Sequence, residues 1–271
     1  MSIVDFSLEG KIALVTGGSK GIGRAIALAF AENGADVAIA ARGVPALEAT
    51  REEIQATGRR CVALSTDVSS DRDLKKLHET VRSELGDVDI LVNNVGGAEP
   101  VGLANISYEQ FERTIRTNTW AAIYLAQLCH PAMKEKHSGV VINISSNGGL
   151  KPDAFLGGYS ASKAALNIVT GQMAQEWAMD GIRSTCICPG LIRTELAMPL
   201  VEHFEKKGFP QNMLRRCGEP EHIAGMALLL ASPAGAYCHG EIFTVDGGEM
   251  WRSTISDEEA DSVISEIDER T

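Results

Sequence analysis

The chain has 271 residues, of which 44% are hydrophobic and 27 are glycine, and its net charge is −11. This length and composition predict one large folded domain and argue against a disordered chain. The acidic balance disfavours nucleic acid or an anionic membrane surface as a partner. In addition, no apolar run reaches the ~18 residues that span a bilayer. From the charge and the lack of such a run, we expect neither a nucleic-acid nor a membrane partner.

Strand-length apolar runs alternate with longer helical patterns along most of the chain. The expected strands are 11–16, 36–41, 61–66, 90–93, 140–145, 182–188 and 242–245, and the expected helices are 21–33, 45–57, 71–85, 108–136, 159–179 and 219–231. Continuously apolar strands that are each followed by a helix indicate a parallel sheet covered on both faces. We therefore predict a single α/β domain over 1–271, with a doubly wound parallel sheet of about seven strands.

The cysteines and histidines give no sign of a metal site. The six cysteines form no Cys-x-x-Cys pair, and the six histidines lack ligand spacing. The amino terminus lacks a basic stretch followed by an apolar one, so we expect no secretory signal. Free thiols in a reducing compartment are the simplest interpretation, which predicts a cytoplasmic protein without a bound metal.

A glycine-rich turn, TGGSKGIG at residues 16–23, joins the first expected strand to the first expected helix. Glycines let the backbone approach a pyrophosphate, and the positive end of a helix favours the charge of that group. A strand before the turn and a helix after it form the context of a dinucleotide-binding site. The alternative is a tight strand-to-helix turn without a ligand.

The end of the second strand indicates which dinucleotide the turn would bind. An acidic residue there would bond both ribose hydroxyls of NAD, but this chain has Ala41 followed by Arg42. An arginine can grip a 2′-phosphate, and Lys20 inside the turn adds a second positive charge. These residues favour NADP(H) over NAD, whereas a solvated charge at a strand end is the alternative for Arg42.

Tyr159 and Lys163 are four residues apart in a segment with strong helix formers, so their side chains should share one face. A nearby ammonium favours the phenolate form of a tyrosine and lowers its pKa. Tyr159 is therefore a candidate proton donor and acceptor near neutral pH. The alternative is a surface pair separated by solvent.

Taken together, these motifs resemble those of the short-chain dehydrogenase/reductase family over about residues 8–248. The turn resembles its TGxxxGxG motif, Asp67-Val68 its adenine-contacting pair, and residues 93–96 its NNAG motif with Val95 in place of alanine. Pro189-Gly190 with Thr194 resembles the stretch that holds the nicotinamide carboxamide, and residues 245–248 the closing VDGG. The resemblance implies a Rossmann-type fold and an NADP-dependent oxidoreductase that acts on a ketone or secondary alcohol.

The resemblance also implies the site residues. The implied catalytic residues are Asn118, Ser146, Tyr159 and Lys163. Ser146 is chosen over Ser145 because it lies 13 residues before Tyr159, as in the family. The implied cofactor-binding residues are Gly17, Ser19, Lys20, Gly21, Ile22, Gly23, Arg42, Asp67, Val68, Asn93, Gly96, Tyr159, Lys163, Pro189, Gly190, Ile192 and Thr194.

In these implied roles, Tyr159 exchanges a proton with the substrate oxygen and Ser146 donates a hydrogen bond to it. Lys163 lowers the tyrosine pKa and binds the nicotinamide ribose, and Asn118 holds a water that relays protons. Residues 195–218 correspond to a mobile substrate lid, and the long helices 108–136 and 159–179 to a dimer or tetramer interface. A 3-oxoacyl thioester reductase, a polyol or sugar dehydrogenase, and a non-catalytic cofactor-binding regulator remain the alternatives.

The acidic extension 249–271 falls outside the family pattern. It carries eight acidic and two basic residues. A disordered tail is one interpretation. The other is a short docked helix over 257–269, because Ser256 and Glu259 fit a capping box and apolar residues follow at helical spacing.

Overall fold

The computed structural model describes residues 3–209 and 211–252, so the expected helix over 257–269 lies outside the described residues. Seven parallel strands form one sheet in the order β3-β2-β1-β4-β5-β6-β7. The strands are β1 Ile12–Thr16, β2 Asp36–Ala41, β3 Cys61–Ser65, β4 Ile90–Asn93, β5 Gly139–Ile144, β6 Ile182–Pro189 and β7 Ile242–Val245. This sheet confirms the predicted fold class.

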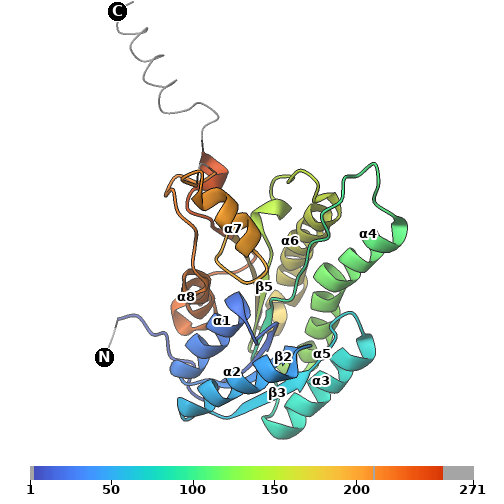
Figure 1. The fold of residues 1–271 in the computed structure, drawn as a ribbon. Coiled ribbons are helices and arrows are strands. Elements are labelled where there is room, and N and C mark those ends of the chain that lie inside the picture. Colours follow the sequence, from blue (N-terminus) through green and yellow to red (C-terminus); the bar gives the residue numbers. More distant parts are fainter. Residues whose placement is uncertain (1–2, 210, 253–271) are drawn as a thin grey trace, which may run out of the picture.

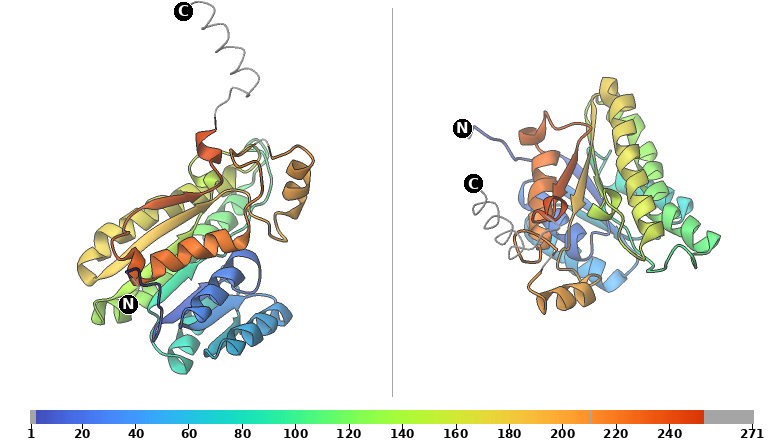
Figure 2. Two further views of the ribbon diagram at one scale, coloured as in Figure 1. Left: turned by 90° about the vertical axis from the view of Figure 1, so that its left-hand side faces the viewer. Right: turned by 90° about the horizontal axis from the view of Figure 1, so that it is seen from above.

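Helices cover both faces of the sheet (Figures 1 and 2). They are α1 Gly21–Glu32, α2 Val44–Ala56, α3 Asp71–Glu84, α4 Tyr108–Ile115, α5 Ala121–Glu135, α6 Gly157–Trp177, α7 Met198–Glu205 and α8 Pro220–Ala231. Strand side chains alternate between two cores: Ala13 and Val15 pack with α1, α2 and α8, whereas Leu14 packs with α3, α5 and α6. Within the described part of the chain, no helix combines the length and apolar character of a bilayer span.

The strand order reverses at β1, which pairs with β2 on one side and with β4 on the other. The loops after β1 and β4 therefore leave the sheet on opposite sides, which opens a crevice at the carboxyl ends of the strands. The glycine turn follows β1 and the segment that begins with Asn94 follows β4. The topology thus brings the two motifs to one edge of the sheet.

One expected helix, 108–136, is not regular. A π-helical segment, Arg116–Trp120, separates α4 from α5 and contains the buried residues Asn118 and Thr119. Thr119 Oγ1 donates to the Ser162 carbonyl at 2.8 Å, and Asn118 Nδ2 donates to Ser162 Oγ at 2.9 Å. The wider turn directs both polar side chains at α6, which apolar periodicity does not reveal. Such π-helical turns are frequent at functional sites.

The predicted lid, 195–218, contains a helix of its own, α7. Val201 on this helix is buried against Phe209 and Cys217 in a small separate core. The apolar residues of this segment therefore divide into two groups, because Leu196 and Leu200 stay exposed. The buried group holds the segment together, and the exposed group is available to a ligand.

Candidate active site

The glycine turn is fixed by contacts that leave no space for side chains. A Cβ atom on Gly23 would lie 2.3 Å from the Gly17 carbonyl oxygen and 2.5 Å from Asn94 Nδ2. Gly17 itself has a φ of +68°, which favours glycine. The turn therefore brings bare backbone to the start of α1, and this cradle fits a pyrophosphate.

Thr16 and Asn94 tie this turn to the segment after β4. Thr16 Oγ1 accepts hydrogen bonds from the backbone N–H groups of Asn94 at 2.9 Å and Val95 at 3.2 Å. Asn94 Nδ2 donates to the Thr16 carbonyl at 3.0 Å. Neither side chain was predicted to have a role of its own, although Thr16 begins the TGxxxGxG motif and Asn94 belongs to the NNAG motif. Their part is to join two loops that are far apart in the chain.

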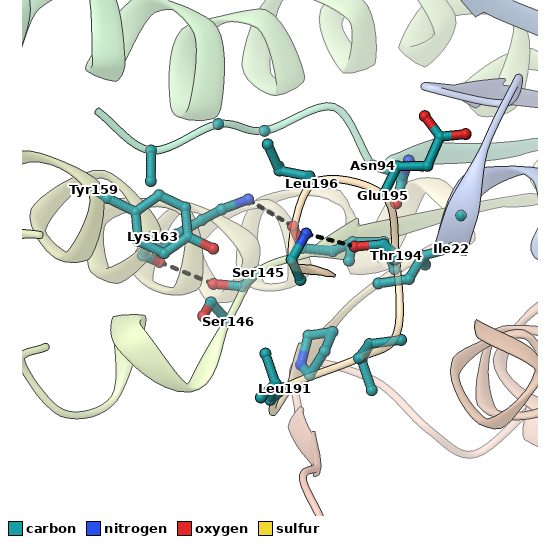
Figure 3. A pocket seen from close by; sticks show the side chains of 18 of the residues that line it. Ile22, Asn94, Ser145, Ser146, Tyr159, Lys163, Leu191, Thr194, Glu195 and Leu196 are labelled. Carbon is teal, nitrogen blue, oxygen red and sulfur yellow. Dashed lines mark hydrogen bonds between the residues drawn. The ribbon is translucent and has the colours of Figure 1, made fainter. Parts of the chain in front are cut away.

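A cavity of about 710 Å³ opens at the carboxyl edge of the sheet (Figure 3). Many predicted site residues line it: Lys20, Gly21, Ile22, Arg42, Gly96, Ser146, Tyr159, Lys163, Pro189, Gly190, Ile192 and Thr194. It is also lined by residues that were not predicted to be site residues: Asn94, Gly97, Ala98, Ile144, Ser145, Leu191, Glu195, Leu196 and Ala197. We call this the main cavity.

The remaining predicted residues do not line the main cavity: Gly17, Ser19, Gly23, Asp67, Val68, Asn93 and Asn118. Asn93 instead donates to Asn143 Oδ1 at 2.9 Å and so links β4 to β5. Val68, Asn93 and Asn118 border a separate void of about 10 Å³, which is about the volume for one water molecule. Asp67 caps its own turn by accepting from Ser69 N at 2.9 Å.

Ser146, Tyr159 and Lys163 lie together at one end of the main cavity (Figure 3). A Cβ atom on Gly148 would lie 3.4 Å from both Ser146 Oγ and Tyr159 Cε1. Lys163 Nζ lies 5.8 Å from the centre of the Tyr159 ring and donates to the Ile144 carbonyl at 2.9 Å. A hydroxyl, a phenol and an amine therefore converge on one space, as proton transfer to a substrate oxygen requires.

Burial dominates the electrostatics of this group. It raises the pKa of Tyr159, and hydrogen bonding with Ser146 only partly opposes that effect. Burial also lowers the pKa of Lys163 to about 8. The expected lowering of the Tyr159 pKa by Lys163 is not met in this structure, because burial of the phenol has the larger effect and raises that pKa. Tyr159 is therefore protonated at neutral pH and can act as a proton donor.

Asn118 lies behind this group and clamps the loop that follows β4. Its Oδ1 accepts from Gly97 N at 3.0 Å, and its Nδ2 donates to the Gly97 carbonyl at 2.9 Å. A Cβ atom on Gly96 would lie 2.8 Å from Lys163 Nζ and 3.6 Å from Asn118 Oδ1. Asn118 thus shapes the wall beside Lys163, and its expected role in holding a relay water stays a prediction.

The two basic residues at the other end of the main cavity differ in their partners. Lys20 Nζ forms an ion pair with Glu195 of the lid at 2.7 Å, although both side chains are largely exposed. Within the described residues, the exposed guanidinium of Arg42 forms no hydrogen bond or ion pair. The pKa of Asp67 is lowered mainly by its hydrogen bonds with Ser69, and the charge of Arg42 adds a smaller lowering. Arg42 is therefore free to meet an anionic ligand.

The wall of the main cavity near the lid is mostly apolar. Ala98, Leu191, Leu196 and Ala197 line it. Glu99, in the loop that follows β4, is paired with Arg113 at 2.9 Å. Among the described residues, no cluster of three or more histidine, cysteine or acidic side chains has the geometry to hold a metal ion.

Comparisons with known proteins agree with this architecture. A family model described as short chain dehydrogenase matches residues 11–205. The chain is 36% identical to 7alpha-hydroxysteroid dehydrogenase of Escherichia coli over 242 residues, which cover 89% of this chain and 94% of the relative. It is 37% identical to a tropinone reductase homolog of Arabidopsis thaliana over 245 residues, or 90% of this chain and 92% of the relative.

Two solved structures with bound cofactors are also similar. A 7alpha-hydroxysteroid dehydrogenase in complex with NADH and 7-oxo glycochenodeoxycholic acid has a TM-score of 0.88 and 34% identity, covering 92% of this chain and 97% of that one. L-sorbose reductase from Gluconobacter frateurii, in complex with NADPH and L-sorbose, has a TM-score of 0.87 and 30% identity, covering 92% of this chain and all of that one.

Proposed function

Because the chain belongs to the short-chain dehydrogenase family and is an oxidoreductase of that family, we propose that it transfers a hydride between NADP(H) and a ketone or secondary alcohol. The observation that carries the proposal is the convergence of Ser146, Tyr159 and Lys163 in a cavity that also contains Lys20 and Arg42. The bare backbone of the glycine turn supports a dinucleotide in that cavity, because a Cβ at Gly23 would fill the cradle.

A bound reduced nicotinamide supplies the hydride for the carbonyl carbon. Tyr159 holds its phenolic proton for the oxygen of the substrate, and burial keeps that proton in place at neutral pH. Ser146 donates a hydrogen bond to the same oxygen as negative charge develops on it. Lys163 holds a charge near the phenol and would contact the nicotinamide ribose. In the oxidation direction Tyr159 first releases its proton to solvent, and its phenolate then accepts the proton of the alcohol.

Arg42 supports NADP(H) as the cofactor rather than NAD. Position 41 is alanine, so the end of β2 offers no carboxylate to bond the ribose hydroxyls of NAD. Arg42 is exposed, and Lys20 lines the same cavity. Because one similar structure holds NADH and another NADPH, similarity alone does not decide between them. The two basic side chains favour the extra phosphate.

The apolar wall formed by Ala98, Leu191 and Leu196 favours an apolar ketone or alcohol over a polyol or sugar. A 3-oxoacyl thioester would undergo the same chemistry at its ketone. A regulator without catalytic activity is the alternative of another class, and the shared position of Ser146, Tyr159 and Lys163 argues against it.

The decisive experiment is to measure NADPH and NADH oxidation with a panel of cyclic ketones, steroid ketones, 3-oxoacyl thioesters and ketoses. We expect turnover with NADPH and an apolar ketone. Cofactor binding without turnover of any compound, in either direction, would favour a regulator. A preference for ketoses would contradict the proposal that the apolar wall near the lid binds an apolar substrate.

We also propose that the chain forms a homodimer or homotetramer through α4, α5 and α6. Tyr108 and Ile168 on α4 and α6 expose 72% and 74% of their surface, so an apolar face remains open there. Trp120 is anchored beside this face, because its Nε1 donates to Asp71 at 2.9 Å. Light scattering on wild type and Ile168→Lys would show whether this face assembles the protein. The cytoplasmic location stays a prediction.

A further inference from the structure

The carboxylate of Asp246, just after β7, has no part in the proposed chemistry. Its Oδ1 accepts from Gly248 N at 2.9 Å, and its Oδ2 accepts from Met250 N at 2.9 Å. The same Oδ2 also accepts from Asn147 Nδ2 at 3.3 Å. Asp246 therefore orders the turn that follows β7 and, in addition, reaches a residue far away in the chain.

Asn147 directly follows Ser146 and begins the short 3-10 turn Asn147–Gly149. This turn fixes the serine, because Ser146 Oγ accepts from Gly148 N at 3.0 Å and the Ser146 carbonyl accepts from Gly149 N at 2.9 Å. Only 4% of Asn147 is exposed, and its Oδ1 has no hydrogen-bond partner in the described part of the chain. Among the described residues, the side-chain amide of Asn147 is thus held by its hydrogen bond to Asp246.

Asp246 also packs against another wall of the main cavity, and the residue after it contacts the lid. A Cβ atom on Gly190 would lie 2.9 Å from Asp246 Cα, so the Pro189-Gly190 stretch packs directly on this residue. The next residue, Gly247, accepts from Leu214 N at 3.1 Å with its carbonyl, which connects it to the end of the lid. The serine turn, the Pro189-Gly190 stretch and the lid therefore meet at one carboxylate-bearing turn.

We propose that Asp246 is a positioning residue for Ser146. Through Asn147, its carboxylate holds the turn that aims the Ser146 hydroxyl at the reacting oxygen. The inference rests on the proposed function, in which that hydroxyl stabilises the developing charge. Misplacing such a group by about 1 Å can cost up to roughly a hundredfold in rate. Loss of the contact should therefore lower kcat rather than the affinity for the cofactor.

The test exchanges the two partners. Asp246→Asn places an amide N–H where an acceptor is needed, so we expect kcat to fall about tenfold while the Kd of NADPH stays within about twofold. In the double variant Asn147→Asp with Asp246→Asn, the new amide can donate to the new carboxylate. We expect this exchange to recover most of the lost kcat with the Kd of NADPH unchanged throughout, whereas a merely structural role for Asp246 would change kcat and Kd together.

A matched control breaks another contact between the same two segments. Glu249→Gln removes the ion pair with Lys151, which is 2.9 Å long, without touching Asp246 or Asn147. We expect this variant to keep a kcat close to that of wild type. The proposal is overturned if Asp246→Asn keeps more than half of the wild-type kcat, if the exchange recovers nothing, or if the control is equally damaged.

Failure of the proposed function would be visible first, as a wild-type protein that turns over no carbonyl compound. Urea unfolding then tests whether the contact exists, with wild type, the single variants Asp246→Asn and Asn147→Asp, and the double variant. Midpoint shifts that are not additive would support the Asn147–Asp246 contact on which the inference depends. Additive shifts would refute the contact and the inference with it.

Discussion

The two ends of the main cavity are constructed differently. At the cofactor end, the shape comes from backbone: Gly17 and Gly23 allow a turn in which side chains would collide with the chain itself. At the substrate end, segments far apart in sequence meet, as in the contact of Asn147 with Asp246 and the packing of Gly190 on Asp246. The glycine turn at the cofactor end thus follows from local sequence, whereas the substrate end depends on tertiary assembly.

The largest expected effect lies at the substrate end. Tyr159→Phe removes only a hydroxyl and should leave folding and cofactor Kd nearly unchanged. Loss of a general acid costs on the order of 10²–10⁴-fold, so we expect kcat to fall by that factor. Steady-state kinetics and a cofactor titration measure the two quantities separately. A variant that keeps more than about a tenth of wild-type kcat would exclude Tyr159 as the proton donor.

The next prediction tests whether residues at the cofactor end set the cofactor preference without affecting the substrate end. Charge-assisted contacts are worth roughly 1.5–3 kcal/mol, so Ala41→Asp with Arg42→Ala should shift the preference from NADPH toward NADH by at least about tenfold. The shift should appear in KM for the cofactor, with little change for the ketone. The control is Lys11→Ala, at an exposed basic residue just before β1 that does not line the main cavity. A wild type that already prefers NADH would show that Arg42 does not read a phosphate.

This contrast explains what could be predicted from the sequence. The seven-stranded sheet and the glycine turn follow from apolar runs and glycine spacing, which are local properties. The π-helical turn at Asn118 and the pairing of Lys20 with Glu195 could not be predicted, since both depend on contacts with distant segments. The predicted lowering of the Tyr159 pKa was not met for the same reason. The four-residue spacing placed Lys163 near Tyr159, but it did not show that both side chains would be buried.

Burial of Lys163 should also be measurable as a pH dependence of stability. Its folded pKa of about 8 is below the ordinary 10.5, so the unfolded state binds more protons between these values. Stability should therefore rise with pH in this window, by about 2 kcal/mol from about pH 7 to about pH 9.5. Urea unfolding of wild type and Lys163→Met at both pH values isolates this contribution. Equal slopes for the two proteins would show that the Lys163 pKa is not depressed.

The smallest effect concerns the contact that joins the two ends, the ion pair between Lys20 and Glu195. Its side chains are 57% and 73% exposed, and such surface pairs contribute at most about 1 kcal/mol. Glu195→Gln should therefore leave thermal stability nearly unchanged. It also removes a carboxylate that competes for Lys20 with an incoming phosphate, so NADPH should bind up to about fivefold more tightly.

Binding of NADH separates this competition from a general effect on the lid. NADH lacks the 2′-phosphate, so its Kd should change less than that of NADPH if Lys20 reads that group. Fluorescence titrations of both cofactors to wild type and Glu195→Gln give the comparison. Weaker binding of NADPH to the variant would mean that Glu195 supports the cofactor instead of competing with it. The lid and the glycine turn would then act together as one cofactor site, and the separation of the two ends would not hold at this point.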